Sequence, residues 1–157
     1  MVKIVADQID VKAVFKKAFI TLTKQICNVE LQEADVFAMP GNGRTITATI
    51  QSRGAFCAAI TCIQDKKLAQ AILLGMTKGR TIPVPEQELY IKEYFNIICG
   101  NGISRINNKI KSASRPGIPV LFEEIKEPEA SAGPEEVIIL RSDYGDMAVY
   151  VNYKWST

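Results

Sequence analysis

The chain of 157 residues contains no histidine. This absence excludes catalysis by Ser-His or Cys-His pairs, and it excludes zinc sites that combine cysteine with histidine. Only four cysteines are present. Cys57 and Cys62 are five positions apart in a predicted strand, so they point to opposite faces of the sheet and cannot share a metal. We therefore predict that this chain binds no metal or other cofactor and that its cysteines are reduced core residues.

Strong charge and long apolar runs are also missing. Nineteen Lys and Arg against seventeen Asp and Glu give a net charge of +2. No dense basic cluster of the kind found in nucleic-acid binders is present, and Lys16-Lys17 and Lys66-Lys67 are interpreted as solvated surface pairs. No run approaches the ~18 uncharged apolar residues of a membrane span, and residues 1–10 lack the apolar core of a signal peptide. We expect a cytoplasmic protein that binds neither nucleic acid nor a membrane.

Three segments have the apolar spacing of helices. They are Ile9 to about Asn28, with Asp7 or Asp10 as the cap, Asp65 to about Thr77, and about Glu86 to about Lys111. The first and third segments are long enough to cover a sheet. Because this length of chain buries roughly 70% of its unfolded surface, we expect one domain over residues 1–157.

Alternating side chains predict the strands of that sheet. Arg44–Gln51 and Phe56–Cys62 form a predicted hairpin around Arg53-Gly54, with one wet and one dry face. Further strands are predicted over 29–38, 118–122, 137–140 and 147–155, and a mobile loop over 127–136. The predicted fold is α/β of the α+β type, in which two long helices pack on one face of a mainly antiparallel sheet.

The long third helix has two contrasting faces. With Ile91 set at zero and about 100° per residue, six residues fall within roughly 100° of it and form an apolar stripe: Phe95, Ile98, Cys99, Gly102, Ile106 and Ile110. Between roughly 140° and 220° lie five residues without a large apolar side chain: Glu93, Asn96, Gly100, Ser104 and Asn107. Glycine in a helix interior costs about 1 kcal/mol relative to alanine, so helix stability does not explain Gly100. A flat spot beside Glu93 and Asn96 would let another molecule approach closely.

The Glu-x-x-Asn spacing of Glu93 and Asn96, followed by Gly100-Asn101, resembles the signature of the CheX chemotaxis phosphatases. These are relatives of CheC and of the middle domain of flagellar switch proteins. The order of the predicted elements is similar over nearly the whole chain. The resemblance implies a CheC/CheX-like fold and a homodimer joined through its sheets. It also implies hydrolysis of the aspartyl phosphate of a CheY-like response regulator, whose own Mg²⁺ and lysine stabilise the phosphoryl group.

The same resemblance implies roles for the residues of the motif. Asn96 would orient the attacking water, and Glu93 would pair with the lysine of the regulator. Gly100 and Asn101 would shape the contact surface or the helix packing. From the residues themselves, we expect the bulky Tyr94 at the rim to narrow or assist docking, and Ser104 on the exposed face to contact the partner as well.

Three other interpretations remain open. Glu93 and Asn96 could be ordinary solvated residues, as charged and amide side chains mostly are. The protein could instead be a non-catalytic dimeric scaffold that binds a receiver domain or a flagellar switch component. A free-standing small-molecule phosphatase is disfavoured, since the sequence has no metal-ligand cluster and no cysteine nucleophile motif. The lifetime of a phosphorylated regulator after mixing separates a phosphatase from a scaffold.

Overall fold

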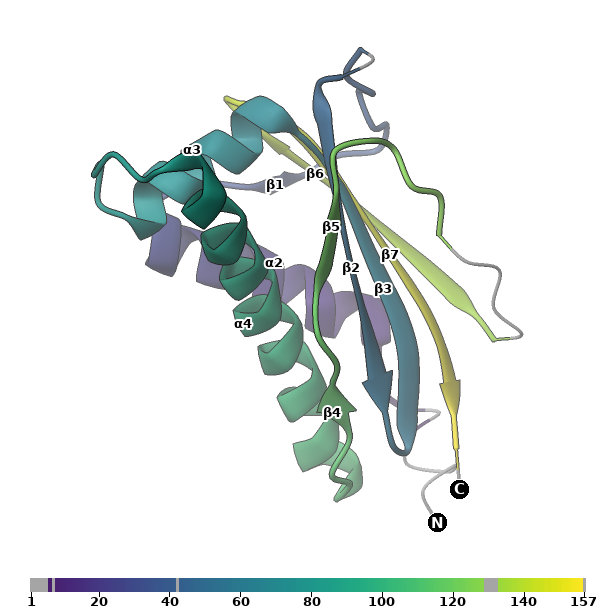
Figure 1. Cartoon of the computed structure of the whole chain (residues 1–157). Helices are drawn as coiled ribbons and strands as arrows, with labels where there is room; N and C mark the ends of the chain where they lie inside the picture. The colour runs from purple at the N-terminus through teal and green to yellow at the C-terminus, as the bar shows by residue number, and fades with distance from the viewer. Residues whose placement is uncertain (1–5, 7, 42, 129–132, 157) are drawn as a thin grey trace.

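The strands pair into one antiparallel sheet, and the helices cover one of its faces (Figure 1). The computed structural model describes residues 6, 8–41, 43–128 and 133–156. The sheet order is β1-β6-β7-β3-β2-β4, and β5 also pairs with β2. The strands are β1 (Gln32–Glu33), β2 (Thr45–Arg53), β3 (Phe56–Asp65), β4 (Arg115–Pro116), β5 (Val120–Phe122), β6 (Glu135–Ser142) and β7 (Gly145–Trp155). The described helices are α2 (Val11–Cys27), α3 (Lys66–Met76) and α4 (Val84–Ile110).

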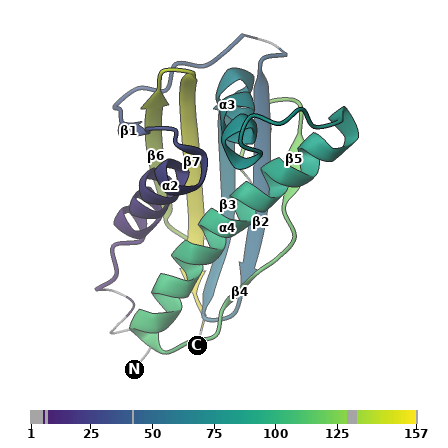
Figure 2. The same cartoon turned by 90° about the vertical axis from the view of Figure 1, so that its left-hand side faces the viewer.

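This architecture confirms the predicted α+β fold. The two long helices, α2 and α4, pack on the same face of the sheet, and α3 lies on that face as well (Figures 1 and 2). Local signals set their starts. The Asp10 carboxylate caps α2 by accepting a hydrogen bond from the Ala13 N–H at 3.0 Å, and the Asp65 carboxylate caps α3 from the Lys67 N–H at 2.9 Å. Figure 2 shows α4 crossing the strands diagonally.

The core lies between the helices and the sheet. Alternation along β2 and β3 buries Ile50 and Ile60 against the helices. At one end of the sheet the ring of Phe56 lies 5.7 Å from that of Tyr153 and 5.2 Å from that of Trp155. These aromatic side chains therefore serve packing.

Cys57 and Cys62 lie on opposite faces of β3, as the two-residue period of a strand requires. Cys62 belongs to the core, whereas Cys57 is half-buried on the other side of β3. Burial raises the pKa of Cys27 to about 11 and raises the pKa of Cys62 and Cys99 as well, so these thiols stay protonated at neutral pH. All four cysteines are free, but the prediction that all four are core residues is wrong for Cys57.

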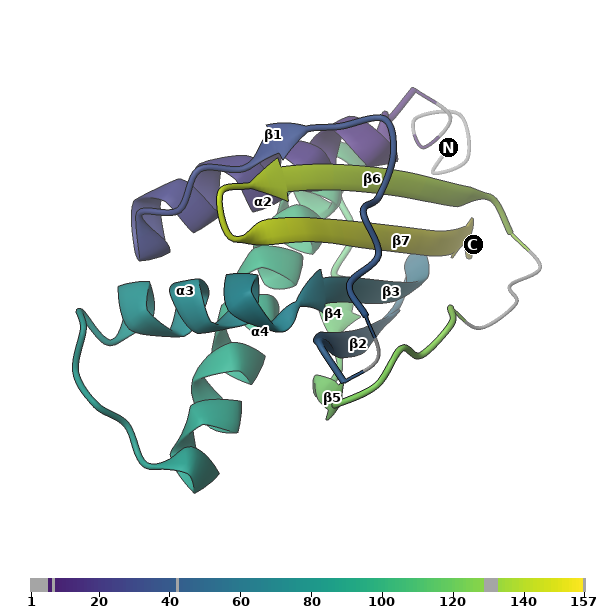
Figure 3. The ribbon, with the colours of Figure 1, turned by 90° about the horizontal axis from the view of Figure 1, so that it is seen from above.

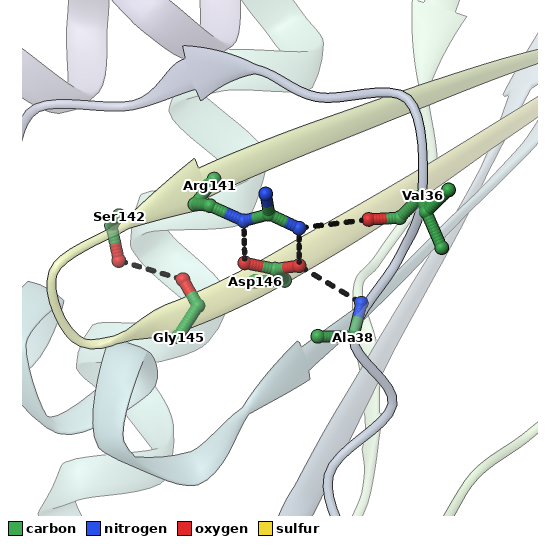
Figure 4. Close-up of polar contacts among 6 residues, drawn as sticks. All are labelled: Val36, Ala38, Arg141, Ser142, Gly145 and Asp146. Atoms are coloured by element: carbon green, nitrogen blue, oxygen red, sulfur yellow. Dashed lines mark hydrogen bonds and ion pairs between the residues drawn. The ribbon is translucent and has the colours of Figure 1, made fainter.

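The predicted strand over residues 29–38 is mostly irregular, and only Gln32–Glu33 pairs with β6. Hydrogen bonds from the side chains of Arg141 and Asp146 hold this segment in place of hydrogen bonds between strands (Figure 4). The Arg141 guanidinium donates to the Val36 carbonyl at 3.0 Å and to both carboxylate oxygens of Asp146, which accepts from the Ala38 N–H at 2.9 Å. Burial alone would raise the pKa of Asp146, but the hydrogen bonds from Arg141 and Ala38 outweigh it and lower that pKa. Seen from above, the connection from β1 to β2 passes across β6 and β7 (Figure 3).

Two other sequence predictions need correction. The apolar alternation over 147–155 suggests a possible edge that could join two copies, but β7 pairs with β6 on one side and β3 on the other and is an interior strand. The predicted mobile loop over 127–136 ends earlier, because Glu135 and Glu136 begin β6. Residues 129–132 of that loop lie outside the described residues. Among the helices that the structure describes, none has the length and apolar character to cross a membrane.

Candidate functional site on the exposed face of α4

Both ends of α4 are fixed by local chemistry. Pro83 stands at the N-cap and Pro85 lies in the first turn, where the missing N–H of proline is harmless. At the other end Lys111 adopts the left-handed conformation with φ of 57°. The Asn107 side chain holds the chain that follows, because its amide donates to the Ser114 carbonyl at 2.8 Å and its oxygen accepts from the Ser114 N–H at 3.0 Å. The backbone of α4 is therefore held in place at both ends.

The buried face of α4 includes Tyr94, which corrects the prediction that this side chain lies at the rim of the site. Tyr94 is 1% exposed, and its hydroxyl shares a 2.7 Å hydrogen bond with the Thr23 hydroxyl of α2. Burial raises its pKa well above the usual value. The helical wheel explains the placement, since Tyr94 lies about 60° from Ile91, inside the apolar stripe. Tyr94 therefore joins α2 to α4 and is not available to a partner.

Glu93 and Asn96 lie on the opposite, solvent-facing side of α4. Glu93 is exposed and Asn96 is half-buried. Three residues apart on a helix, their side chains are neighbours with Cβ atoms about 5–6 Å apart. Within the part of the chain that the structure describes, neither side chain has a hydrogen bond or an ion pair, whereas the nearby Glu88 and Lys92 pair with each other at 3.1 Å. The carboxylate and the amide are both free to bind another molecule.

Gly100 leaves open space on the same face. Apart from its two chain neighbours and the adjoining backbone of α4, a Cβ atom built on Gly100 meets no described atom within 4 Å. Two residues later, a Cβ atom on Gly102 would lie 2.5 Å from the Phe15 ring. Gly102 is thus required by the packing of α2 on α4, but nothing in this fold requires glycine at position 100. Contact with another molecule would explain the glycine at this position.

The remaining predicted site residues have different surroundings. Ser104 is exposed on the same face. Asn101 is half-buried, and its side-chain oxygen accepts a 2.9 Å hydrogen bond from Arg105. Asn107, which the helical wheel also places on this face, is used inside the chain to hold Ser114. The structure therefore brings together Glu93, Asn96, Gly100 and Ser104.

One residue of this face was missed by the sequence reasoning. Leu89 lies one turn before Glu93, at about 160° on the same wheel, and its side chain is 63% exposed. A leucine with this exposure in line with Glu93 and Asn96 adds an apolar contact to an otherwise polar surface. Its position on the wheel was the signal that could have identified it.

The chemistry available on this face is limited. An amide does not transfer protons at neutral pH, but it can hold a water molecule by donating one hydrogen bond and accepting another. One carboxylate can pair with a cation of a partner. Among the described residues no three His, Cys, Asp or Glu side chains gather as a metal site would need. The face can orient a water molecule and pair with a cation.

Comparison with known proteins shows the fold. No family model matches the sequence, and no curated protein is significantly similar to it. Solved structures match over nearly the whole chain. The chemotaxis protein CheX from Vibrio vulnificus has a TM-score of 0.76 at 16% identity, covering 93% of this chain and 97% of that one. CheX from Desulfovibrio desulfuricans has a TM-score of 0.75 at 13% identity, covering 93% and 100%.

A complex of CheX with CheY, BeF3 and Mg²⁺ from Borrelia burgdorferi is also similar. Its TM-score is 0.72 at 13% identity, and the match covers 94% of this chain and 99% of that one. At these identities the agreement concerns the backbone. The chain has a CheX-like fold.

Proposed function

We propose that this protein accelerates the hydrolysis of the aspartyl phosphate of a CheY-like response regulator. The observation that carries the proposal is the solvent-facing pair Glu93 and Asn96, both without a partner among the described residues, beside the open surface at Gly100. The CheX-like fold supports it, because one protein with this fold was solved in a complex with CheY.

Asn96 is proposed to act on the attacking water. Its amide holds the water by one donated and one accepted hydrogen bond, in line with the bond from phosphorus to the aspartyl oxygen. Fixing a water in this geometry removes much of the entropic cost of the reaction. Little covalent chemistry is needed from the protein, since phosphoryl transfer depends mainly on positioning and electrostatic stabilisation.

Glu93 is proposed to fix the docked partner. Its carboxylate pairs with the lysine at the phosphorylation site of the regulator. The Mg²⁺ that neutralises the phosphoryl oxygens belongs to the regulator as well, where carboxylates and the phosphate hold it. Gly100 allows the surface of the regulator to approach the helix, Leu89 adds an apolar contact, and Ser104 and Asn101 border this contact surface.

The proposal is tested by mixing the protein with a panel of phosphorylated receiver domains from the same genome and following the loss of phosphate. At least one regulator should lose its phosphate much faster, and chelation of Mg²⁺ should abolish the effect. Calorimetry of this protein alone with Mg²⁺ should show no tight site. A regulator that binds without faster decay would identify a scaffold, and unchanged decay across the panel would contradict the proposal.

The protein is also proposed to form a homodimer. Within the described residues, the outer side of β6 is paired only near its end, where β1 meets Leu140 and Arg141 and the Ala34 N–H donates to the Ile139 carbonyl. The preceding part of β6 leaves an edge that a second copy could extend, although Glu135 and Glu136 at its start disfavour pairing in many registers. A monomer mass at micromolar concentration in ultracentrifugation would contradict this proposal.

A further inference from the structure

Lys92 lies beside Asn96 at the border between the buried and exposed faces of α4, and the proposed function gives it no role. On a helix, the neighbours of a side chain are those three and four residues away. The exposed or half-buried neighbours of Asn96 are Lys92, Glu93 and Gly100. Lys92 lies one turn before Asn96 and about 40° from it on the wheel. Between residues 89 and 104 it is the only lysine or arginine.

An ion pair holds the Lys92 side chain away from Asn96 in the free protein. Its ammonium nitrogen lies 3.1 Å from the carboxylate of Glu88, which is one turn further back along α4. The side chain of Lys92 is 33% exposed and that of Glu88 is 57% exposed. Ion pairs of this spacing at a helix surface contribute little free energy, so Lys92 can exchange Glu88 for a stronger anion at little cost.

Docking as proposed creates a demand for positive charge beside Asn96. A phosphoryl group in transfer spreads negative charge over three oxygens, and the cations around it supply much of the rate. Glu93 brings a further negative charge to this place, and by pairing with the lysine of the regulator it weakens the attraction of that lysine to the phosphoryl oxygens. A cation next to Asn96 would restore the balance, and Lys92 is the one that α4 carries there.

We propose that Lys92 is a further catalytic residue, whose ammonium group leaves Glu88 on docking and binds an oxygen of the phosphoryl group. The inference rests on the proposed function and places one cation of this chain beside the reacting atoms. An ammonium group binds phosphate as a point charge, and its flexible four-carbon stem lets it move toward the ligand.

Lys92 takes no part in the bonds that change. The attacking water forms its bond to phosphorus as the bond from phosphorus to the aspartyl oxygen breaks, and the carboxylate of the regulator and inorganic phosphate are the products. The protons of the water pass to the released phosphate and to solvent. The ammonium group only stabilises the negative charge of the phosphoryl oxygens during this step.

Support of the helix is the other role that the ion pair could have, and two variants separate the roles. Lys92→Gln and Glu88→Gln both break the pair, so a structural role predicts the same small effect from both. A catalytic role predicts different effects. Lys92→Gln removes the cation, whereas Glu88→Gln only releases it for the phosphoryl group.

The first measurement is the kcat/KM for loss of phosphate from the regulator. Lys92→Gln should lower it at least about tenfold, whereas Glu88→Gln should leave it unchanged or raise it up to about threefold. Lys92→Arg keeps the charge and should retain more activity than Lys92→Gln.

Lys109→Gln is the matched control, because it changes the net charge by the same amount as Lys92→Gln. Lys109 is exposed, lies about 140° from Asn96 on the wheel, and forms no ion pair among the described residues. Its replacement should change kcat/KM by less than about twofold. Thermal unfolding confirms that each variant is folded.

The second measurement tests the contact without hydrolysis. Beryllofluoride stands in for the phosphoryl group, so we compare the Kd of the regulator with Mg²⁺ alone and with Mg²⁺ and beryllofluoride. The unaltered protein should prefer the loaded regulator. Lys92→Gln should reduce this preference at least about fivefold, whereas Glu88→Gln and Lys109→Gln should change it by less than about twofold.

Equal losses from Lys92→Gln and Glu88→Gln would overturn the inference, because the pair would then only support the helix. Equal losses from Lys92→Gln and Lys109→Gln would overturn it too, since net charge would explain the effect. An unaltered protein without preference for the loaded regulator would also overturn it.

The fate of the proposed function is read separately. Faster phosphate loss that Lys92→Gln leaves unchanged would overturn the role of Lys92 and keep the phosphatase. A preference for the loaded regulator that depends on Lys92, without faster phosphate loss, would contradict the phosphatase and support the contact.

Discussion

The two faces of α4 differ in what explains their residues. On the buried face, Tyr94 bonds to Thr23 and Gly102 admits the Phe15 ring, so the fold accounts for each residue. On the exposed face, Asn96 lacks a partner among the described residues and Gly100 faces open space. The same helix thus contains one glycine that packing requires and one that it does not. A residue that costs stability and serves no internal contact points to a requirement outside the chain.

The first way to test this contrast is Glu93→Ala, which should have the largest effect on docking. The change removes the charge partner of a lysine that becomes buried in the complex, a loss that costs roughly 2–5 kcal/mol of binding. The Kd for the phosphorylated regulator should rise accordingly, whereas the free energy of unfolding should change by less than about 0.5 kcal/mol because Glu93 is exposed. Titration of the regulator and thermal melts measure the two quantities. A lower free energy of unfolding with an unchanged Kd would show that Glu93 serves the fold and not docking.

Gly102→Ala should give the reverse pattern. The added methyl group would overlap the Phe15 ring, and overpacking of this kind costs roughly 1–3 kcal/mol, partly offset by the gain of about 1 kcal/mol in helix propensity. We expect a net destabilisation of up to about 2 kcal/mol, measured by urea unfolding. The kcat of the protein that remains folded should be unchanged, and a selective loss of kcat would contradict the assignment of this face to packing.

Tyr94→Phe separates the two roles considered for this residue. Removing the hydroxyl breaks the buried hydrogen bond to Thr23 and should lower the free energy of unfolding by about 1 kcal/mol. Affinity for the regulator should stay the same, because the side chain does not reach the surface. A weaker complex with unchanged stability would restore the predicted role at the rim.

Gly100→Ala should have the smallest effect on the fold, and of opposite sign to Gly102→Ala. Alanine in an exposed helix interior should raise the free energy of unfolding by up to about 1 kcal/mol. The new methyl group would occupy the surface that the regulator approaches, so kcat/KM should fall about fivefold, equivalent to about 1 kcal/mol. A more stable protein with full activity would show that the open surface at Gly100 has no part in docking.

Much of the fold could be predicted from periodicity, but not every boundary. The helical spacing of apolar residues gave α2, α3 and α4 to within about two residues, since Asp10 and Asp65 are local capping signals. The segment over 29–38 was predicted as a strand, because nothing local shows that Arg141 and Asp146 will bind its backbone at Val36 and Ala38. Contacts between residues a hundred positions apart leave no pattern in the segment itself.

The site, like the fold, could be predicted only where the signal is local to one segment. The helical wheel places Glu93, Asn96 and Gly100 on one exposed face, and it places Tyr94 on the buried face. The groove between the beginning of α2 and the end of α4, lined by Lys17, Arg105 and Lys109, could not be predicted, since it depends on how α2 packs against α4. One helix can be analysed from its own sequence, whereas a surface built from two helices requires the fold.

The central claim is that Asn96 positions the water that attacks the aspartyl phosphate. The most direct measurement is the decay of the phosphorylated regulator at saturating regulator concentration with the unaltered protein and with Asn96→Ala. The kcat of the variant should fall by on the order of 10²-fold, while binding of the regulator persists and the free energy of unfolding moves by less than about 0.5 kcal/mol. Phosphate loss at an unchanged rate, or a variant that no longer folds, would contradict the claim.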